Sequence, residues 1–163
     1  MFELFSHIAP RTCENFIQLC ESWKCPENGE IIGYTVKNDK QKNVIQRVVK
    51  GMYLQMGEIT RVQEGGCSIY GGEFADESFH VKHTEAGLLG MCKRTGLKHT
   101  NESQFYITLG APLTFLDNHS VVFGRVISGF DCLQRIGLES SYLEESFINE
   151  EGNPSDVRLV ASG

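Results

Sequence analysis

The chain has 163 residues, a length that fits one domain with a single core. Its 40% hydrophobic, 22% charged and 10% aromatic residues are ordinary for a globular protein and exclude collagen-like and disordered classes. The apolar runs are far shorter than the roughly 20 residues that cross a bilayer, so we expect no membrane partner. The net charge of −6, with no basic cluster beyond Lys37, Lys40 and Lys42, disfavours nucleic acid as a partner.

The N-terminal part predicts a strand, a helix and a long loop. A short apolar strand, Phe2–Phe5, precedes a helix that begins at Pro10, where the missing amide hydrogen costs nothing. Helical spacing places four residues of this helix on one face for burial: Cys13, Phe16, Ile17 and Cys20. Turn residues then interrupt the pattern over about 21–43, and a loop of this length indicates a functional or family-specific segment.

The rest of the chain reads as short strands separated by glycines, which is typical of a β-barrel or sandwich. The expected strands are Val44–Val49, Met52–Met56, Gly87–Lys93, Ser103–Leu109, Val121–Val126 and Asp156–Ala161. A second helix is expected from Phe130 to about Leu138. The acidic stretch Glu139–Glu151 indicates a solvated loop.

Several kinds of catalytic site lack the residues that they need. The histidines are isolated and none has the spacing that places two metal ligands on one helix face, so we expect no metal ion. No serine lies in a G-x-S-x-G motif, and the paired glycines match no phosphate-binding loop.

Arg47 is a charged residue inside an expected strand. It shares a strand face with Ile45 and Val49, where a guanidinium must reach water or find a polar partner. Taken alone, this pattern favours an edge-strand arginine whose head group reaches solvent. Gln55, in the next expected strand, can lie beside Arg47 and hold its head group, so both interpretations stay open at this point.

The cysteines bear on cellular location. Six cysteines are scattered without a C-x-x-C pair, which favours free thiols in a reducing compartment. We therefore expect an intracellular protein, cytoplasmic in the first instance, with nuclear and ciliary locations left open.

Ordered motifs along nearly the whole chain resemble the cyclophilins. Phe2–Phe5 and Pro10–Phe16 are similar to the family's F-E-L-F and P-x-T-x-E-N-F segments, and Val44–Gly57 is similar to the motif around its catalytic arginine. Further segments that follow the family's order are Ser68–Gly71, Lys82–Thr84, Gly87–Met91, Thr100–Thr108, Leu116–Asp117 and Val121–Gly124. The segment 21–43 is similar in position to the insertion of the divergent-loop cyclophilins.

The resemblance implies a mainly β fold, an eight-stranded antiparallel barrel capped by two helices. It further implies that residues 1–163 form a single domain with an inserted loop at about 21–43. Family members usually begin with a strand before the F-E-L-F segment, and this first strand is missing here. We expect a truncated form, an isoform, or a partner chain that donates the strand, because an open barrel leaves unpaired edges.

The resemblance also implies peptidyl-prolyl cis-trans isomerase activity on X-Pro bonds of proline-containing peptides or proteins, with no metal and no cofactor. Arg47 takes the place of the catalytic arginine, and Gln55 that of the residue that orients it. The proline pocket corresponds to Met52, Tyr53, Tyr106, Phe115, Leu116 and Ser120. Cys92 and Lys93 correspond to the backbone rim that pairs with substrate.

Several of these positions depart from the family pattern. Met52 and Tyr106 replace phenylalanines, and Gln46 and Ser120 replace histidines. A flexible methionine weakens packing on a proline ring by about 1 kcal/mol, so reduced turnover is expected. Phe115 stands where the family often has tryptophan, so we expect weak cyclosporin binding at most.

The alternative function is a catalytically weak or inactive cyclophilin-like subunit. Such a subunit binds proline segments or scaffolds a large intracellular assembly of the splicing or ciliary kind. The changed pocket residues favour this alternative, whereas the retention of Arg47 and Gln55 favours catalysis, which we rank first.

Overall fold

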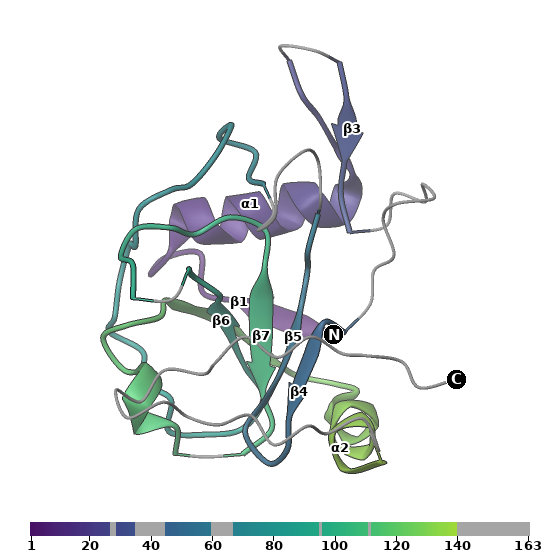
Figure 1. The fold of residues 1–163 in the computed structure, drawn as a ribbon, viewed down its shortest axis with the longest axis vertical. Helices are drawn as coiled ribbons and strands as arrows, with labels where there is room; N and C mark the ends of the chain where they lie inside the picture. Colours follow the sequence, from purple (N-terminus) through teal and green to yellow (C-terminus); the bar gives the residue numbers. More distant parts are fainter. Residues whose placement is uncertain (27–28, 35–44, 60–66, 95, 111, 140–163) are drawn as a thin grey trace.

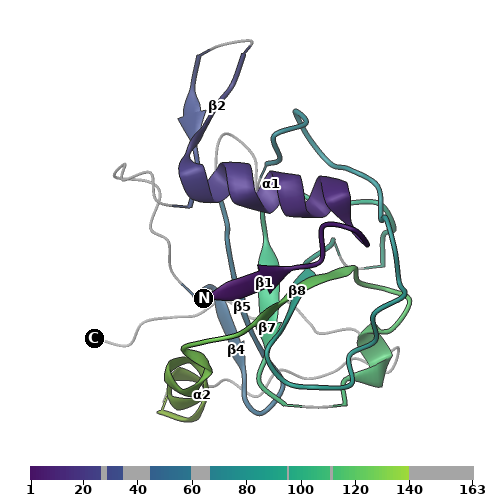
Figure 2. The same ribbon diagram turned by 180° about the vertical axis from the view of Figure 1, so that it is seen from behind.

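The computed structural model of the chain describes residues 1–26, 29–34, 45–59, 67–94, 96–110 and 112–139. Within these residues a six-stranded antiparallel sheet has the order β1-β8-β6-β7-β5-β4. Its strands are β1 (Phe2–Leu4), β4 (Arg47–Val49), β5 (Tyr53–Met56), β6 (Leu88–Met91), β7 (Phe105–Thr108) and β8 (Val122–Val126). Helices α1 (Pro10–Glu21) and α2 (Phe130–Glu139) lie at opposite ends of the sheet (Figures 1 and 2).

The predicted strands and helices within the described residues are confirmed, with the strands shorter than expected at their ends. Strands β1 and β4 form the edges of the described sheet, which does not close into a barrel. The expected strand Asp156–Ala161 lies outside the described residues, as does the acidic stretch after Glu139. None of the helices within the described ranges has the length and apolar character needed to cross a membrane.

The long segment after α1 is not a bare loop. Its first part forms a small antiparallel hairpin of β2 (Trp23–Lys24) and β3 (Ile31–Ile32), which projects beyond α1 (Figure 1). Ile32 is fully buried and packs with Leu19 of α1, so this hairpin is attached to the domain through a small apolar cluster of its own. The remainder of the predicted loop, 35–43, lies outside the described residues.

Helix α1 buries a face that the apolar spacing predicted only in part. Cys13 and Phe16 are buried as expected, but Ile17 and Cys20 are exposed, so that expectation was wrong for both. The buried face is turned instead toward Asn15, whose side-chain amide donates to the Glu102 carbonyl at 2.8 Å and accepts from the Ile69 N–H at 3.0 Å. Because apolar spacing ignores polar contacts to loops, it placed the buried stripe too far around the helix.

The main core lies between α1 and the sheet and is rich in aromatic rings. Phe16 of α1 meets Phe105 of β7 at 5.1 Å between ring centroids and Phe123 of β8 at 5.3 Å. The buried residues of this main core are Ala9, Cys13, Phe16, Phe74, Leu89, Met91, Phe105, Ile107, Val121 and Phe123. Since strand side chains alternate between faces, Tyr106, between Phe105 and Ile107, points away from this core.

Candidate active site

A second apolar cluster lies on the side of β7 opposite the main core. We call it the tyrosine cluster, and its members are the buried residues Val49, Tyr53, Tyr106 and Leu113 with the partly buried residues Met52, Cys92, Phe115 and Leu116. The rings of Tyr53 and Tyr106 lie 5.6 Å apart at 52°. The predicted pocket residues therefore come together here, apart from Ser120, which lies behind Tyr106.

Strands β4 and β5 carry the predicted catalytic pair to the edge of this cluster. The strands form a tight hairpin in which Gly51 has φ +71°, and their register sets Arg47 directly opposite Gln55. Opposite residues of an antiparallel pair have Cβ atoms about 4.5–5.5 Å apart, within reach of long side chains. The amide of Gln55 also donates to the Gln104 side-chain oxygen at 2.8 Å, so a neighbouring segment fixes its orientation.

The charge of Arg47 acts on the tyrosine cluster. Burial raises the pKa of the Tyr53 hydroxyl and of the Cys92 thiol, and in both cases the positive charge of Arg47 opposes that rise. Such opposition requires the guanidinium to lie near both groups. A permanent positive charge is thus held beside a partly exposed apolar surface.

Tyr106 is bound through its hydroxyl to a polar network behind the cluster. The hydroxyl lies 2.6 Å from Nε2 of His83, and Ser120 opposes the rise in its pKa that burial causes. Nδ1 of His83 lies 2.8 Å from a carboxylate oxygen of Asp117. Burial lowers the pKa of His83 and outweighs the opposing effect of Asp117, so the ring is neutral at pH 7.

The neutral ring fixes the direction of these bonds. Since a carboxylate only accepts, Nδ1–H of His83 donates to Asp117, and Nε2 accepts from the Tyr106 O–H. The hydroxyl has room for this because residue 90 is glycine: a Cβ there would lie 2.2 Å from both Cζ and the oxygen of Tyr106.

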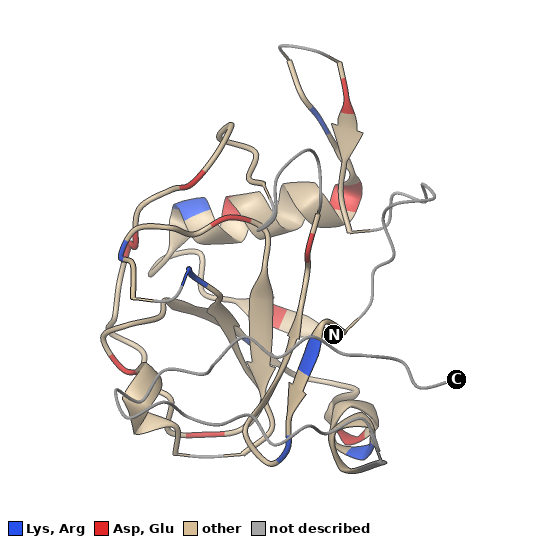
Figure 3. Cartoon of the chain, viewed as in Figure 1, with Lys and Arg blue, Asp and Glu red and all other residues tan. Residues whose placement is uncertain are grey.

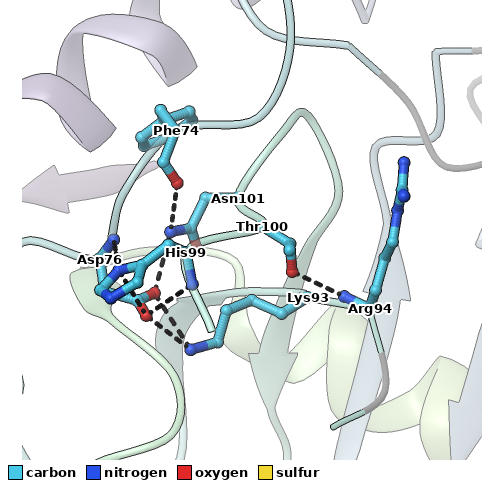
Figure 4. Close-up of polar contacts among 7 residues, drawn as sticks. All are labelled: Phe74, Asp76, Lys93, Arg94, His99, Thr100 and Asn101. Carbon is cyan, nitrogen blue, oxygen red and sulfur yellow. Dashed lines mark hydrogen bonds and ion pairs between the residues drawn. The ribbon is translucent and has the colours of Figure 1, made fainter. Parts of the chain in front are cut away.

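The two predicted rim residues differ in what they do. The Cys92 N–H donates to the Gln104 carbonyl at 3.1 Å, and the Cys92 side chain joins the tyrosine cluster. The Lys93 side chain is turned away from it, with Nζ 3.0 Å from each carboxylate oxygen of Asp76 (Figure 4). The structure therefore places Lys93 as an anchor for the segment that follows β6.

Asp76 accepts hydrogen bonds, through its carboxylate, from several polar groups of that segment. Its carboxylate, 2% exposed, also accepts from the Asn101 side chain at 2.9 Å and from the His99 backbone at 3.1 Å (Figure 4). Burial raises the pKa of Asp76, but the hydrogen bonds from Asn101, Lys93 and His99 outweigh it and lower the pKa overall. The carboxylate is therefore ionised and fully used in holding Lys93, His99 and Asn101.

Other site chemistries find little support within the described parts of the chain. No group of three or more His, Cys, Asp or Glu side chains is arranged there to hold a metal ion. Among the residues that are coloured in Figure 3, Lys and Arg are spread over separate elements.

Sequence reasoning missed the residues that hold the cluster from behind. His83 and Asp117 are 34 residues apart, and Gln104 is 49 residues from Gln55. No motif or spacing links such positions, because only the folded sheet brings them together. A weak signal existed in Gly90 and Tyr106, since a glycine in a buried strand indicates that another group approaches closely.

Comparison with known proteins identifies relatives along the full chain. The family model for "Cyclophilin type peptidyl-prolyl cis-trans isomerase/CLD" matches residues 1–154. The NK-tumor recognition protein of Mus musculus is 46% identical over 167 residues, which cover 100% of this chain but only 10% of that protein. The peptidyl-prolyl cis-trans isomerase of Encephalitozoon cuniculi is 38% identical over 151 residues, 90% of this chain and 79% of that protein.

Two human proteins are also similar to this chain. The E3 SUMO-protein ligase RanBP2 is 44% identical over 135 residues, 82% of this chain and 4% of that protein. The "Probable inactive peptidyl-prolyl cis-trans isomerase-like 6" is 36% identical over 159 residues, 94% of this chain and 49% of that protein. The chain thus spans a small part of several relatives that it matches.

Proposed function

This chain belongs to the family of cyclophilin-type peptidyl-prolyl cis-trans isomerases, and we propose that it accelerates cis-trans exchange of X-Pro bonds in proline-containing proteins. The observation that carries the proposal is the position of Arg47, opposite Gln55 and beside the tyrosine cluster, where its charge acts on Tyr53 and Cys92. The cluster offers an apolar surface for a proline ring, and Arg47 offers a charge at its edge.

Isomerisation of an X-Pro bond requires few chemical groups beyond this arrangement. Rotation about a peptide bond has a barrier of about 18–20 kcal/mol because the C–N bond has partial double-bond character. A guanidinium N–H directed at the prolyl nitrogen stabilises the pyramidal, deconjugated form of that nitrogen more than the planar ground state. Arg47 supplies the donor, and Gln55, held by Gln104, orients it. Met52, Tyr53, Tyr106, Phe115 and Leu116 contact the proline ring, and Cys92 and Lys93 present backbone groups to the peptide.

The direct test measures catalysed exchange on a short Ala-Pro peptide by NMR exchange spectroscopy. We expect Arg47→Ala to lower the catalysed rate by about 10²–10³-fold, the effect of removing one preorganised donor at a developing charge. Arg125→Ala is the matched control, because Arg125 is an exposed arginine of β8 that pairs with Glu3 at 2.6 Å. Equal acceleration by the wild type and Arg47→Ala contradicts the assigned role of Arg47.

A second candidate function is binding of proline segments without turnover. It is supported by the flexible Met52 in the cluster and by the relative named as probably inactive. The same peptide separates the two functions: an NMR titration that shows binding, with no acceleration of exchange, favours the binding function. Participation in a large assembly is supported by the relatives in which the matching part is a small fraction of the protein.

We also propose how the protein responds to cyclosporin and where it is located. Weak cyclosporin binding at most is supported by Phe115, which is partly buried in the cluster. A location inside the cell, in the cytoplasm, is supported by the free thiols of Cys13, Cys20, Cys92 and Cys132. Calorimetric titration with cyclosporin and microscopy of the tagged chain test them.

A further inference from the structure

We propose that His83 is a positioning residue that holds two walls of the tyrosine cluster, Tyr106 and the 3₁₀ segment η1 (Thr114–Leu116), in one fixed arrangement. The inference rests on the proposed function, because it takes the cluster to be the surface that binds proline. His83 does not touch that surface itself, since it is fully buried.

Every polar group of His83 leads to one of these walls. Its backbone N–H donates to Asp117 at 2.9 Å, and its carbonyl accepts from the Leu113 N–H at 2.9 Å. Leu113 precedes η1 and Asp117 follows it, so His83 is bonded to both ends of the segment that carries Phe115 and Leu116. The ring bond from Nδ1 to Asp117 strengthens the hold on the second end.

The other ring nitrogen holds the opposite wall. Nε2 accepts from the Tyr106 hydroxyl at 2.6 Å, and the two rings are stacked with centroids 6.0 Å apart. A phenylalanine at residue 106 would have no such attachment. The glycine at residue 90, which leaves space for the hydroxyl, makes this attachment possible.

A histidine suits this position because its neutral ring donates at one nitrogen and accepts at the other. Asn and Gln can each reproduce one half: the Asn amide lies near the position of Nδ1, and the Gln amide near that of Nε2. His83→Asn is therefore expected to keep the bond to Asp117 and lose Tyr106, whereas His83→Gln is expected to keep Tyr106 and loosen η1. Tyr106→Phe removes only the hydroxyl.

The test combines peptide affinity, exchange rate and the mobility of the Tyr106 ring. We expect His83→Asn and Tyr106→Phe each to weaken binding of an Ala-Pro peptide by about three- to tenfold, with the exchange rate at saturation changed less than twofold. In the apo protein, ¹³C-labelled Tyr106 should show a second conformer or line broadening in His83→Asn. The double variant should bind no more weakly than the weaker single variant, because both changes break the same bond.

The experiment distinguishes failure of the positioning role of His83 from failure of the proposed function. His80→Asn, at an exposed histidine, should match the wild type in every measurement. Additive losses in the double variant, or an unchanged Tyr106 signal and affinity in a folded His83→Asn, overturn the proposal. If His83→Asn does not fold, His83→Gln and Tyr106→Phe decide, since unchanged affinity in both contradicts it. If the wild type binds no peptide, the proposed function fails, while the apo ring signal still tests the positioning.

Discussion

Side chains on the two faces of strand β7 are buried in different environments. On one side Phe105 and Ile107 enter the main core, where aromatic rings pack edge to face and need no polar partner. On the other side Tyr106 enters the tyrosine cluster, and its hydroxyl is satisfied by His83. Neighbouring residues of one strand thus belong to two clusters: Phe105 and Ile107 pack through apolar contacts, whereas Tyr106 also has a hydrogen-bonded hydroxyl.

The difference separates stability from function. The main core is closed and apolar, so its loss is a loss of packing and transfer free energy. The tyrosine cluster is only partly buried at Met52, Cys92, Phe115 and Leu116, and it keeps an apolar surface open beside Arg47. Burial of its polar network has a desolvation cost that burial of hydrocarbon does not have, but the hydrogen bonds of the network fix the direction of each ring.

The largest effect is expected from the main core. Phe105→Ala should lower the free energy of unfolding by about 3–5 kcal/mol, the usual cost of a large cavity. Chemical denaturation measures this loss, and Phe105→Leu should recover most of it. For protein that remains folded, we expect Ala-Pro peptide affinity to change less than twofold. A binding loss as large as that of a cluster variant would break the separation of the two sides.

The sequence predicted the fold more completely than the site. Alternation and glycine punctuation located each described strand of the main sheet because these depend on local geometry. Helical spacing failed for Ile17 and Cys20, which are exposed, because it takes no account of the polar contact between the buried Asn15 and a loop. A long turn-rich segment hid the β2–β3 hairpin because its strands are only two residues each.

For the site, the residues facing the cluster were predicted, whereas of the described residues behind Tyr106 only Ser120 was assigned to the site. The resemblance to a family named Met52, Tyr53 and Tyr106, which the structure brings together. It also named the backbone of Lys93 for the rim, which stays a prediction, and it did not predict that the Lys93 side chain lies against Asp76. His83 supports residues far away in the sequence, and a contact of that kind is visible only when the sheet is assembled.

The next effect concerns the space that Tyr106 needs. Gly90→Ala places a Cβ 2.2 Å from the Tyr106 ring, so the ring or strand β6 must shift. Overpacking of this kind costs about 1–3 kcal/mol of unfolding free energy, less than the Phe105 cavity. Peptide binding should nevertheless fall further than in Phe105→Ala, because the shifted group lines the cluster. Gly72→Ala is the matched control, because Gly72, like Gly90, does not have a positive φ and a Cβ there would meet nothing within 4 Å.

The smallest effect is a pH dependence that comes from His83, in the polar network behind the tyrosine cluster. The folded pKa of His83 is lowered by burial against the opposing pull of Asp117, whereas the unfolded pKa is about 6.5. Below that pH the unfolded chain binds a proton that the folded protein resists, so unfolding becomes easier as the pH falls. Denaturation between pH 7.5 and 5 should show this decline in the wild type and a weaker decline in His83→Asn, which has no titratable side chain at residue 83.

The main core contributes no titratable group to this pH range, since its buried members are apolar apart from Cys13, whose pKa is raised by burial. Equal slopes in the two proteins would contradict the lowered pKa of His83. A wild type that instead gains stability relative to His83→Asn as the pH falls would show that His83 is protonated in the fold, and the donor and acceptor roles assigned to its ring would then have to be reversed at Tyr106.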